Sequence, residues 1–292
     1  MIPLLNNTEH QKFLELNGYL KLHLLNESII NKLIDFANKQ GIVNNNDCFA
    51  SNTVLSKEQN KIISKEITTI LKENIKNVFI NEEYHGGTFL IKRKENGELF
   101  LHQDNTIVDN TLDTAYYLWI PLEDVNRNNG CMYVLPGSHN YFNNYVSYSL
   151  KNRDIHRNLI PSKYLKDIEM KRGEVLIFSS RLFHGSYKNK FLKNRIAINV
   201  LLTNKGAQLV YYNKIDATTI SKYLIQPLDY LNSYNEYSKG NLPTNAIFEK
   251  NILYNNLLID HTVLYKKLTN KNFPKYKEII FKITDFFSNI LN

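Results

Sequence analysis

Between Tyr84 and Asn204 the sequence carries short apolar runs separated by turn-forming residues, and this pattern constrains the fold more than any other feature. The runs are Thr88–Ile91, Thr114–Leu122, Cys131–Leu135, Glu174–Phe178 and Arg195–Leu202. Short strands at this spacing are typical of an all-β sandwich or barrel. The Asn and Gly residues in the turns favour antiparallel pairing. We therefore predict a mainly β core over residues 84–204.

The residues before this segment have helical periodicity. Thr8 is the expected N-cap of a first helix, with Gln11 as its capping-box partner. Asn26 is expected to cap a second helix that ends at Gly41. A third helix is expected from Ser56 to Val78, with its isoleucines on one face.

Residues 205–292 return to helical and irregular character, which predicts a helical C-terminal extension. Its clearest part is an amphipathic pattern near the end of the chain, made by Phe273, Tyr276, Ile279, Ile280, Ile283, Phe286, Phe287 and Ile290. Such a helix can dock on the outer face of the barrel, or serve as a lid or a homodimer interface. We predict one domain over residues 1–292, with N-terminal helices in 1–83.

Composition excludes several classes of protein. The net charge is +8, but the lysines are spread along the chain, with no basic run with interleaved aromatics, so no nucleic-acid partner is expected. No apolar stretch suits a signal peptide or a membrane span. The two cysteines, Cys48 and Cys131, lack CxxC spacing, and a cytoplasmic location is the simplest expectation. Hydrolase elbows and phosphate-binding loops are absent from the sequence.

The chemistry is indicated by Leu101-His102-Gln103-Asp104. In an extended segment, residues i and i+2 point to the same face, so His102 and Asp104 can reach one metal ion. A second histidine must come from another strand, and His184 is the best candidate. Two neutral imidazoles and one carboxylate on one face of an octahedron suit Fe(II) and leave the opposite face open.

Arg195 lies 11 residues after His184, where an apolar strand begins. An arginine facing the inside of a barrel would be a costly buried charge unless an anion met it. A dicarboxylate co-substrate would supply that anion through a two-pronged contact with the guanidinium. The alternative is an arginine at a strand end in solvent.

Taken together, these segments resemble the phytanoyl-CoA dioxygenase family of Fe(II)/2-oxoglutarate oxygenases over about residues 85–205. The matching segments, in chain order, are Leu101–Asp104, Leu118–Asp124 with Asn128–Cys131, Val134–His139, Lys171–Phe178, His184–Ser186 and Arg195. The resemblance implies a double-stranded β-helix, or jelly-roll, core. The last 85 or so residues resemble nothing in this family.

The resemblance also implies roles for single residues. His102, Asp104 and His184 match the iron triad and are the expected catalytic residues. Arg195 matches the residue that pairs with the distal carboxylate of 2-oxoglutarate. Four further contacts to this co-substrate are expected from Ser186, Trp119, Thr88 and Tyr117. Trp119 can equally be a barrel-core aromatic, and His139 either a turn residue or a substrate contact.

The function implied by the resemblance is hydroxylation of an unactivated C–H bond in a small molecule. The expected cofactor is Fe(II), the expected co-substrates are 2-oxoglutarate and O2, and succinate and CO2 are released. The same site can instead catalyse desaturation, epoxidation or cyclisation. Asp104 fills the position that related halogenases leave to chloride, so halogenation is not expected. A non-catalytic, cupin-like metal-binding module is the alternative of another class. Asp109 and Asp113 mildly favour a substrate with an amino group, among amino-acid-like, acyl and natural-product candidates.

Overall fold

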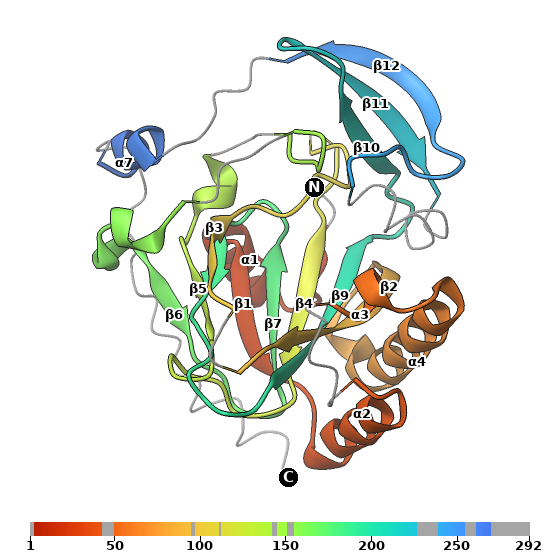
Figure 1. Cartoon of the computed structure of the whole chain (residues 1–292), viewed down its shortest axis with the longest axis vertical. Coiled ribbons are helices and arrows are strands. Elements are labelled where there is room, and N and C mark those ends of the chain that lie inside the picture. The colour runs from red at the N-terminus through yellow and green to blue at the C-terminus, as the bar shows by residue number, and fades with distance from the viewer. Residues whose placement is uncertain are drawn as a thin grey trace.

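Two β-sheets form the centre of the computed structural model (Figure 1), which describes residues 3–42, 50–94, 97–110, 112–141, 145–150, 155–226, 239–254 and 261–269. The larger sheet has the strand order β1-β7-β4-β9-β2 and the smaller one β3-β8-β5-β6. The larger sheet contains β1 (Tyr19–His23), β2 (Glu82–Lys92), β4 (Tyr116–Pro121), β7 (Glu174–Ser179) and β9 (Arg195–Asn204). The smaller sheet contains β3 (Leu99–His102), β5 (Met132–Val134), β6 (Lys166–Ile168) and β8 (His184–Ser186). All pairings are antiparallel, as predicted, and the mainly β jelly-roll core is confirmed.

Alternation along β4 separates two apolar cores. Leu118 and Ile120 join the core that the N-terminal helices cover, whereas Trp119 packs between the two sheets. The covering elements are α1 (Thr8–Asn17), α2 (Glu27–Lys39) and α4 (Lys57–Ile75), whereas α3 (Ser51–Val54) lies beside β2 at the cavity. The helices therefore bury the outer face of the large sheet and leave its inner face to the cavity.

The helix termini follow their capping residues, with one correction. Asn26 caps α2 by accepting from the backbone N–H of Ile29 at 3.0 Å, as predicted. The cap of α1 is Asn7 rather than Thr8. The side chain of Gln11 does not complete a capping box, because its Oε1 accepts from the backbone N–H groups of Leu4 and Leu5. The predicted third helix is α4 followed by a 3-10 turn, Lys76–Val78.

The prediction of helices alone as the regular elements before residue 84 misses β1. Gly18 ends α1 in the left-handed conformation, at φ +79, and β1 then pairs with β7. A strand of five residues between two helices has too few alternations for its period to be distinct. Its pairing with β7 decides its conformation.

The predicted helical extension is wrong for most of its described part. Residues 209–253 contain a three-stranded sheet made by β10 (Leu209–Lys214), β11 (Thr219–Ile225) and β12 (Ile247–Leu253), coloured teal to blue in Figure 1. Among the residues after 204 that the structure describes, the one helix is α7 (His261–Thr269). β10 and β11 form an antiparallel pair joined by a short turn, and this tertiary pairing overrides the weak helical pattern. The amphipathic segment 273–290, with its lid or dimer role, lies outside the described residues.

Within the described ranges, no helix combines the length and apolar character that crossing a membrane requires.

We expect Gly18→Ala to lower the free energy of unfolding by about 2–4 kcal/mol, because the left-handed backbone and overpacking both add cost. A Cβ at Gly18 would lie 2.8 Å from Leu182 Cδ1 and against the ring of His139. Gly206→Ala is the matched control, since Gly206 has φ +83 but open space around it, and should cost only about 1 kcal/mol. Urea denaturation of both variants measures the difference, and equal losses would contradict the packing argument.

Candidate metal centre and its cavity

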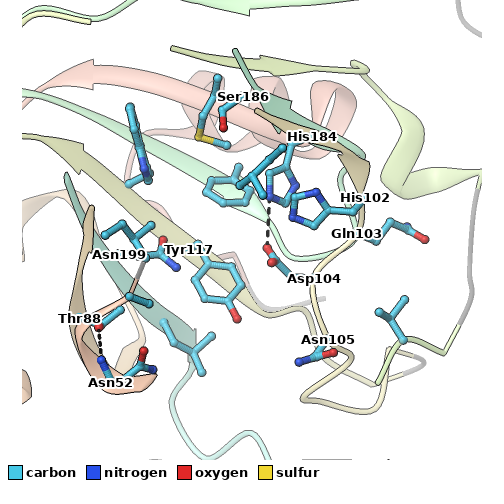
Figure 2. A pocket seen from close by; sticks show the side chains of 18 of the residues that line it. Asn52, Thr88, His102, Gln103, Asp104, Asn105, Tyr117, His184, Ser186 and Asn199 are labelled. Atoms are coloured by element: carbon cyan, nitrogen blue, oxygen red, sulfur yellow. Dashed lines mark hydrogen bonds and ion pairs between the residues drawn. The ribbon is translucent and has the colours of Figure 1, made fainter. Parts of the chain in front are cut away.

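Strand pairing places the two predicted histidine ligands side by side. His102 ends β3 and lies directly opposite His184, the first residue of β8. Asp104 follows β3, where its backbone N–H donates to the carbonyl of Ser180 at 3.0 Å. One ligand atom from each of the three residues lies within 4.8 Å of the others, and Figure 2 shows the side chains turned toward one another. His184 Nε2 is 3.7 Å from Asp104 Oδ2.

Backbone carbonyls orient both imidazoles. His102 Nδ1 lies 2.8 Å from the carbonyl oxygen of Phe100, and His184 Nδ1 lies 2.9 Å from that of Leu182. A carbonyl only accepts, so each Nδ1 carries the hydrogen and each Nε2 keeps its lone pair for a metal ion. This is the arrangement that metal-binding histidines require.

Burial sets the charge states of the cluster. It lowers the pKa of His184 to about 4, so this imidazole stays neutral and able to ligate. Burial also raises the pKa of Asp104 to about 6, with His102 opposing the shift. A carboxylate in contact with the buried, neutral imidazole of His184 is costly unless a cation joins it. The donor set therefore fits a divalent metal ion.

The triad borders a cavity of about 620 Å³, and the other expected site residues lie on its wall. Thr88, Tyr117, Trp119, Ser186 and Arg195 all line it. Figure 2 shows Tyr117 and Thr88 on the side opposite the two histidines. Tyr117 stacks on Phe178, with ring centroids 5.6 Å apart, and Thr88 Oγ1 lies 2.8 Å from Ser51 Oγ. All five side chains therefore lie at the cavity, and their contact with a co-substrate stays a prediction.

Arg195 is only 4% exposed, which excludes the alternative of an arginine in solvent. Its guanidinium lies 5.0 Å from the centre of the Trp119 ring, and its Nη2 donates to the carbonyl of Gly130 at 3.3 Å. Nε and Nη1 are buried and have no hydrogen-bond partner among the residues that the structure describes. Burial lowers the pKa of Arg195 to about 10, so it remains a cation at neutral pH. Two free N–H donors on a buried cation fit an incoming carboxylate.

Three residues that the sequence offered as possible substrate contacts, Asp109, Asp113 and His139, do not have that role in the structure. Asp109 accepts from Lys222 Nζ at 2.8 Å, and neither Asp109 nor Asp113 lines the cavity. The two acidic side chains therefore give no support to a substrate amino group. His139 is buried, with Nε2 2.9 Å from the carbonyl of Glu15, which makes it a structural residue that joins its turn to α1.

The polar side chains of the cavity wall that the sequence did not single out include Asn52, His85, Lys92 and Asn199. Lys92 carried a readable signal, because it follows the apolar run Phe89–Ile91 at the end of a predicted strand. The other three lack a distinctive motif, and only the packing of α3, β2 and β9 places them at the cavity.

Comparison with known proteins agrees with the motifs. A family model described as phytanoyl-CoA dioxygenase (PhyH) matches residues 27–197, more than half of the chain. The chain therefore belongs to the phytanoyl-CoA dioxygenase family.

Curated relatives match over a shorter stretch. Phytanoyl-CoA dioxygenase 1 of Oryza sativa subsp. japonica is 31% identical over 114 residues, 36% of this chain and 38% of the relative. Phytanoyl-CoA dioxygenase of Arabidopsis thaliana is 36% identical over 109 residues, with the same two shares. The chain thus spans well under half the length of these relatives.

Two solved structures share the fold at low identity. The epimerase SnoN, solved with Fe3+, alpha ketoglutarate and nogalamycin RO, is 14% identical with a TM-score of 0.51, over 69% of this chain and 84% of SnoN. HygX from Streptomyces hygroscopicus, solved with nickel and 2-oxoglutarate, is 13% identical with a TM-score of 0.50, over 68% of this chain and 87% of HygX.

We expect Mn(II), an oxidation-resistant probe, to stabilise the protein against heat, because only the folded chain assembles the three ligands. At metal concentrations about 100-fold above Kd the gain should be about 2.7 kcal/mol. His184→Ala should abolish this shift, whereas the exposed histidine variant His156→Ala should retain it. Differential scanning calorimetry with and without Mn(II) measures the shift, and a full shift in His184→Ala would contradict the assignment.

Proposed function

We propose that this chain is an Fe(II)- and 2-oxoglutarate-dependent dioxygenase that hydroxylates an unactivated C–H bond of a small molecule, with release of succinate and CO2. The observation that carries the proposal is the combination of two features in one cavity. His102, Asp104 and His184 offer converging ligand atoms, and Arg195 has two buried donors without a partner. A metal-chelating oxo-diacid is a ligand that uses both features.

The chain's own residues divide the work. His102, Asp104 and His184 would hold the iron and leave the rest of its coordination sphere open to ligands. Arg195, braced against Trp119, would hold the distal carboxylate and so fix the direction of the oxo-diacid. When bound, the iron and 2-oxoglutarate supply the oxidising power for attack on a C–H bond.

The substrate's place is the remainder of the cavity wall. Apolar side chains there, such as Leu90, Met132 and Leu201, exclude water from the reacting centre. Polar groups that can orient a substrate come from Asn52 on α3 and from Ser147 and Tyr148 in the segment 145–150. This mixed lining supports a small-molecule substrate held by a few hydrogen bonds.

Two alternatives make different products. Desaturation, epoxidation or cyclisation would use the same residues and differ only in how the substrate is placed, so the product's mass separates them from hydroxylation. A non-catalytic metal-binding module would need only the triad. The buried Arg195 beside the triad favours an enzyme, since a metal-binding module gives this charge no task.

We expect the wild-type protein to release succinate from 2-oxoglutarate in the presence of Fe(II), slowly without substrate and faster with one. Asp104→Ala should lower this rate by more than about 100-fold, because it removes a metal ligand. Asp216→Ala, at an exposed turn, is the matched control and should keep the wild-type rate.

Succinate and CO2 are measured together, and mass spectrometry of a substrate library identifies the product. Full turnover by Asp104→Ala would sink the proposal.

A further inference from the structure

Lys92 lies directly opposite Arg195 in the sheet. It is the last residue of β2, and Arg195 is the first residue of β9, and the two are register partners. Side chains of directly opposed residues in an antiparallel pair project to the same face. Both residues line the cavity. The cavity wall therefore has a second cationic side chain beside Arg195.

The two cations are buried together without an anion. Lys92 is 1% exposed and Arg195 is 4% exposed. In the described part of the chain, no carboxylate oxygen lies within 4 Å of either side chain's nitrogens, and the Lys92 ammonium donates to the carbonyl of Gly97. Like charges opposite one another in a sheet are destabilising, and more so when buried. An anionic ligand would relieve this cost.

The backbone at Gly97 and Gly130 packs closely against the aliphatic part of the Lys92 side chain. A Cβ at Gly97 would lie 3.2 Å from Lys92 Cγ, and one at Gly130 would lie 3.1 Å from Lys92 Cε. Both glycines have φ +85. The carbonyl of Gly130 also accepts from Arg195 Nη2. Gly130 therefore contacts both cationic side chains and helps to orient them.

The pKa of Lys92 agrees with this geometry. Burial, with a further contribution from Arg195, lowers the pKa of Lys92 to about 7, and Glu98 and Cys131 oppose the shift. An anion bound beside the ammonium would raise that pKa again. Binding at neutral pH would then draw a proton onto the lysine.

We propose that Lys92 is a second positioning residue for the co-substrate, sharing the distal carboxylate of the oxo-diacid with Arg195. This inference rests on the proposed function and deepens it. The two free donors of Arg195 and the ammonium of Lys92 surround one carboxylate with charge-assisted hydrogen bonds. The pair consequently selects a 2-oxo diacid over a 2-oxo monoacid of the same length.

The test measures binding to the Mn(II)-loaded protein without oxygen, by calorimetry, with 2-oxoglutarate and with 2-oxopentanoate, which lacks the distal carboxylate. Lys92→Met should weaken 2-oxoglutarate binding by about tenfold or more, since a charge-assisted contact is lost. It should leave 2-oxopentanoate binding unchanged. Lys92→Arg should restore much of the affinity, and Lys94→Met, at an exposed neighbour, should match the wild type.

Two further readouts separate positioning from a merely structural role. Lys92→Met should leave the ligand-free protein at least as stable as the wild type, because it removes an unpaired buried charge. Wild-type binding of 2-oxoglutarate at pH 7 to 8 should take up protons, seen as a dependence of the heat on buffer ionisation enthalpy. This uptake should vanish in Lys92→Met, since Arg195 stays charged and the pKa of Cys131 is raised to about 12.

The outcomes distinguish this inference from the proposed function. If the wild type binds neither acid, the oxygenase proposal fails. If Arg195→Met loses 2-oxoglutarate binding while Lys92→Met keeps it, the co-substrate site stands and the role of Lys92 is overturned. Should Lys92→Met not fold, the proton uptake of the wild type decides, and binding without uptake overturns the inference.

Discussion

The pairing of β3 with β8 is the interaction on which the candidate site depends. It sets His102 against His184, and a slip of one residue would turn one imidazole to the other face of the sheet. The close pairing of the strands requires glycine at position 185. A Cβ there would lie 2.6 Å from both the carbonyl oxygen of Leu99 and the hydroxyl of Tyr133. That hydroxyl donates to the same carbonyl at 2.7 Å. A glycine after the second histidine is therefore a packing requirement of the metal centre.

The cavity wall carries charges of both signs. Asp104, whose side chain is 26% exposed, contributes a carboxylate at the metal centre, and Lys92 and Arg195 contribute buried cations. Each charge is costly without a counter-ion and is stabilised by a ligand of opposite sign. A metal ion stabilises the carboxylate, and the carboxylate group of a ligand stabilises the two cations. A molecule that chelates the metal and carries a distal carboxylate can lie in only one orientation.

The features that could be predicted from the sequence are those that depend on residues close together in the chain. The triad and Arg195 could be found because residues in an extended segment alternate between faces and because a charge in an apolar strand is unusual. The cap of α2 is a local signal as well. β1 and β10–β12 could not be found in this way, since their conformation depends on partners distant in the chain. Lys92 is a charge at the end of an apolar run and could be noticed, but its role follows only from its pairing with Arg195, which the sequence does not state.

The sheet β10–β12 explains why the sequence motifs do not identify the substrate. It lies beyond the family-matched residues 27–197, yet it supports the segment 145–150 that lines the cavity. Leu150 packs with Tyr212 and Ile220, and Lys214 N–H donates to Ser149 Oγ at 3.0 Å. Lys222 joins β11 to the segment that follows Asp104, because its Nζ lies 2.8 Å from Asp109 Oδ2. A wall held by elements outside residues 27–197 can change its shape without disturbing the metal centre, so the family match does not determine the substrate.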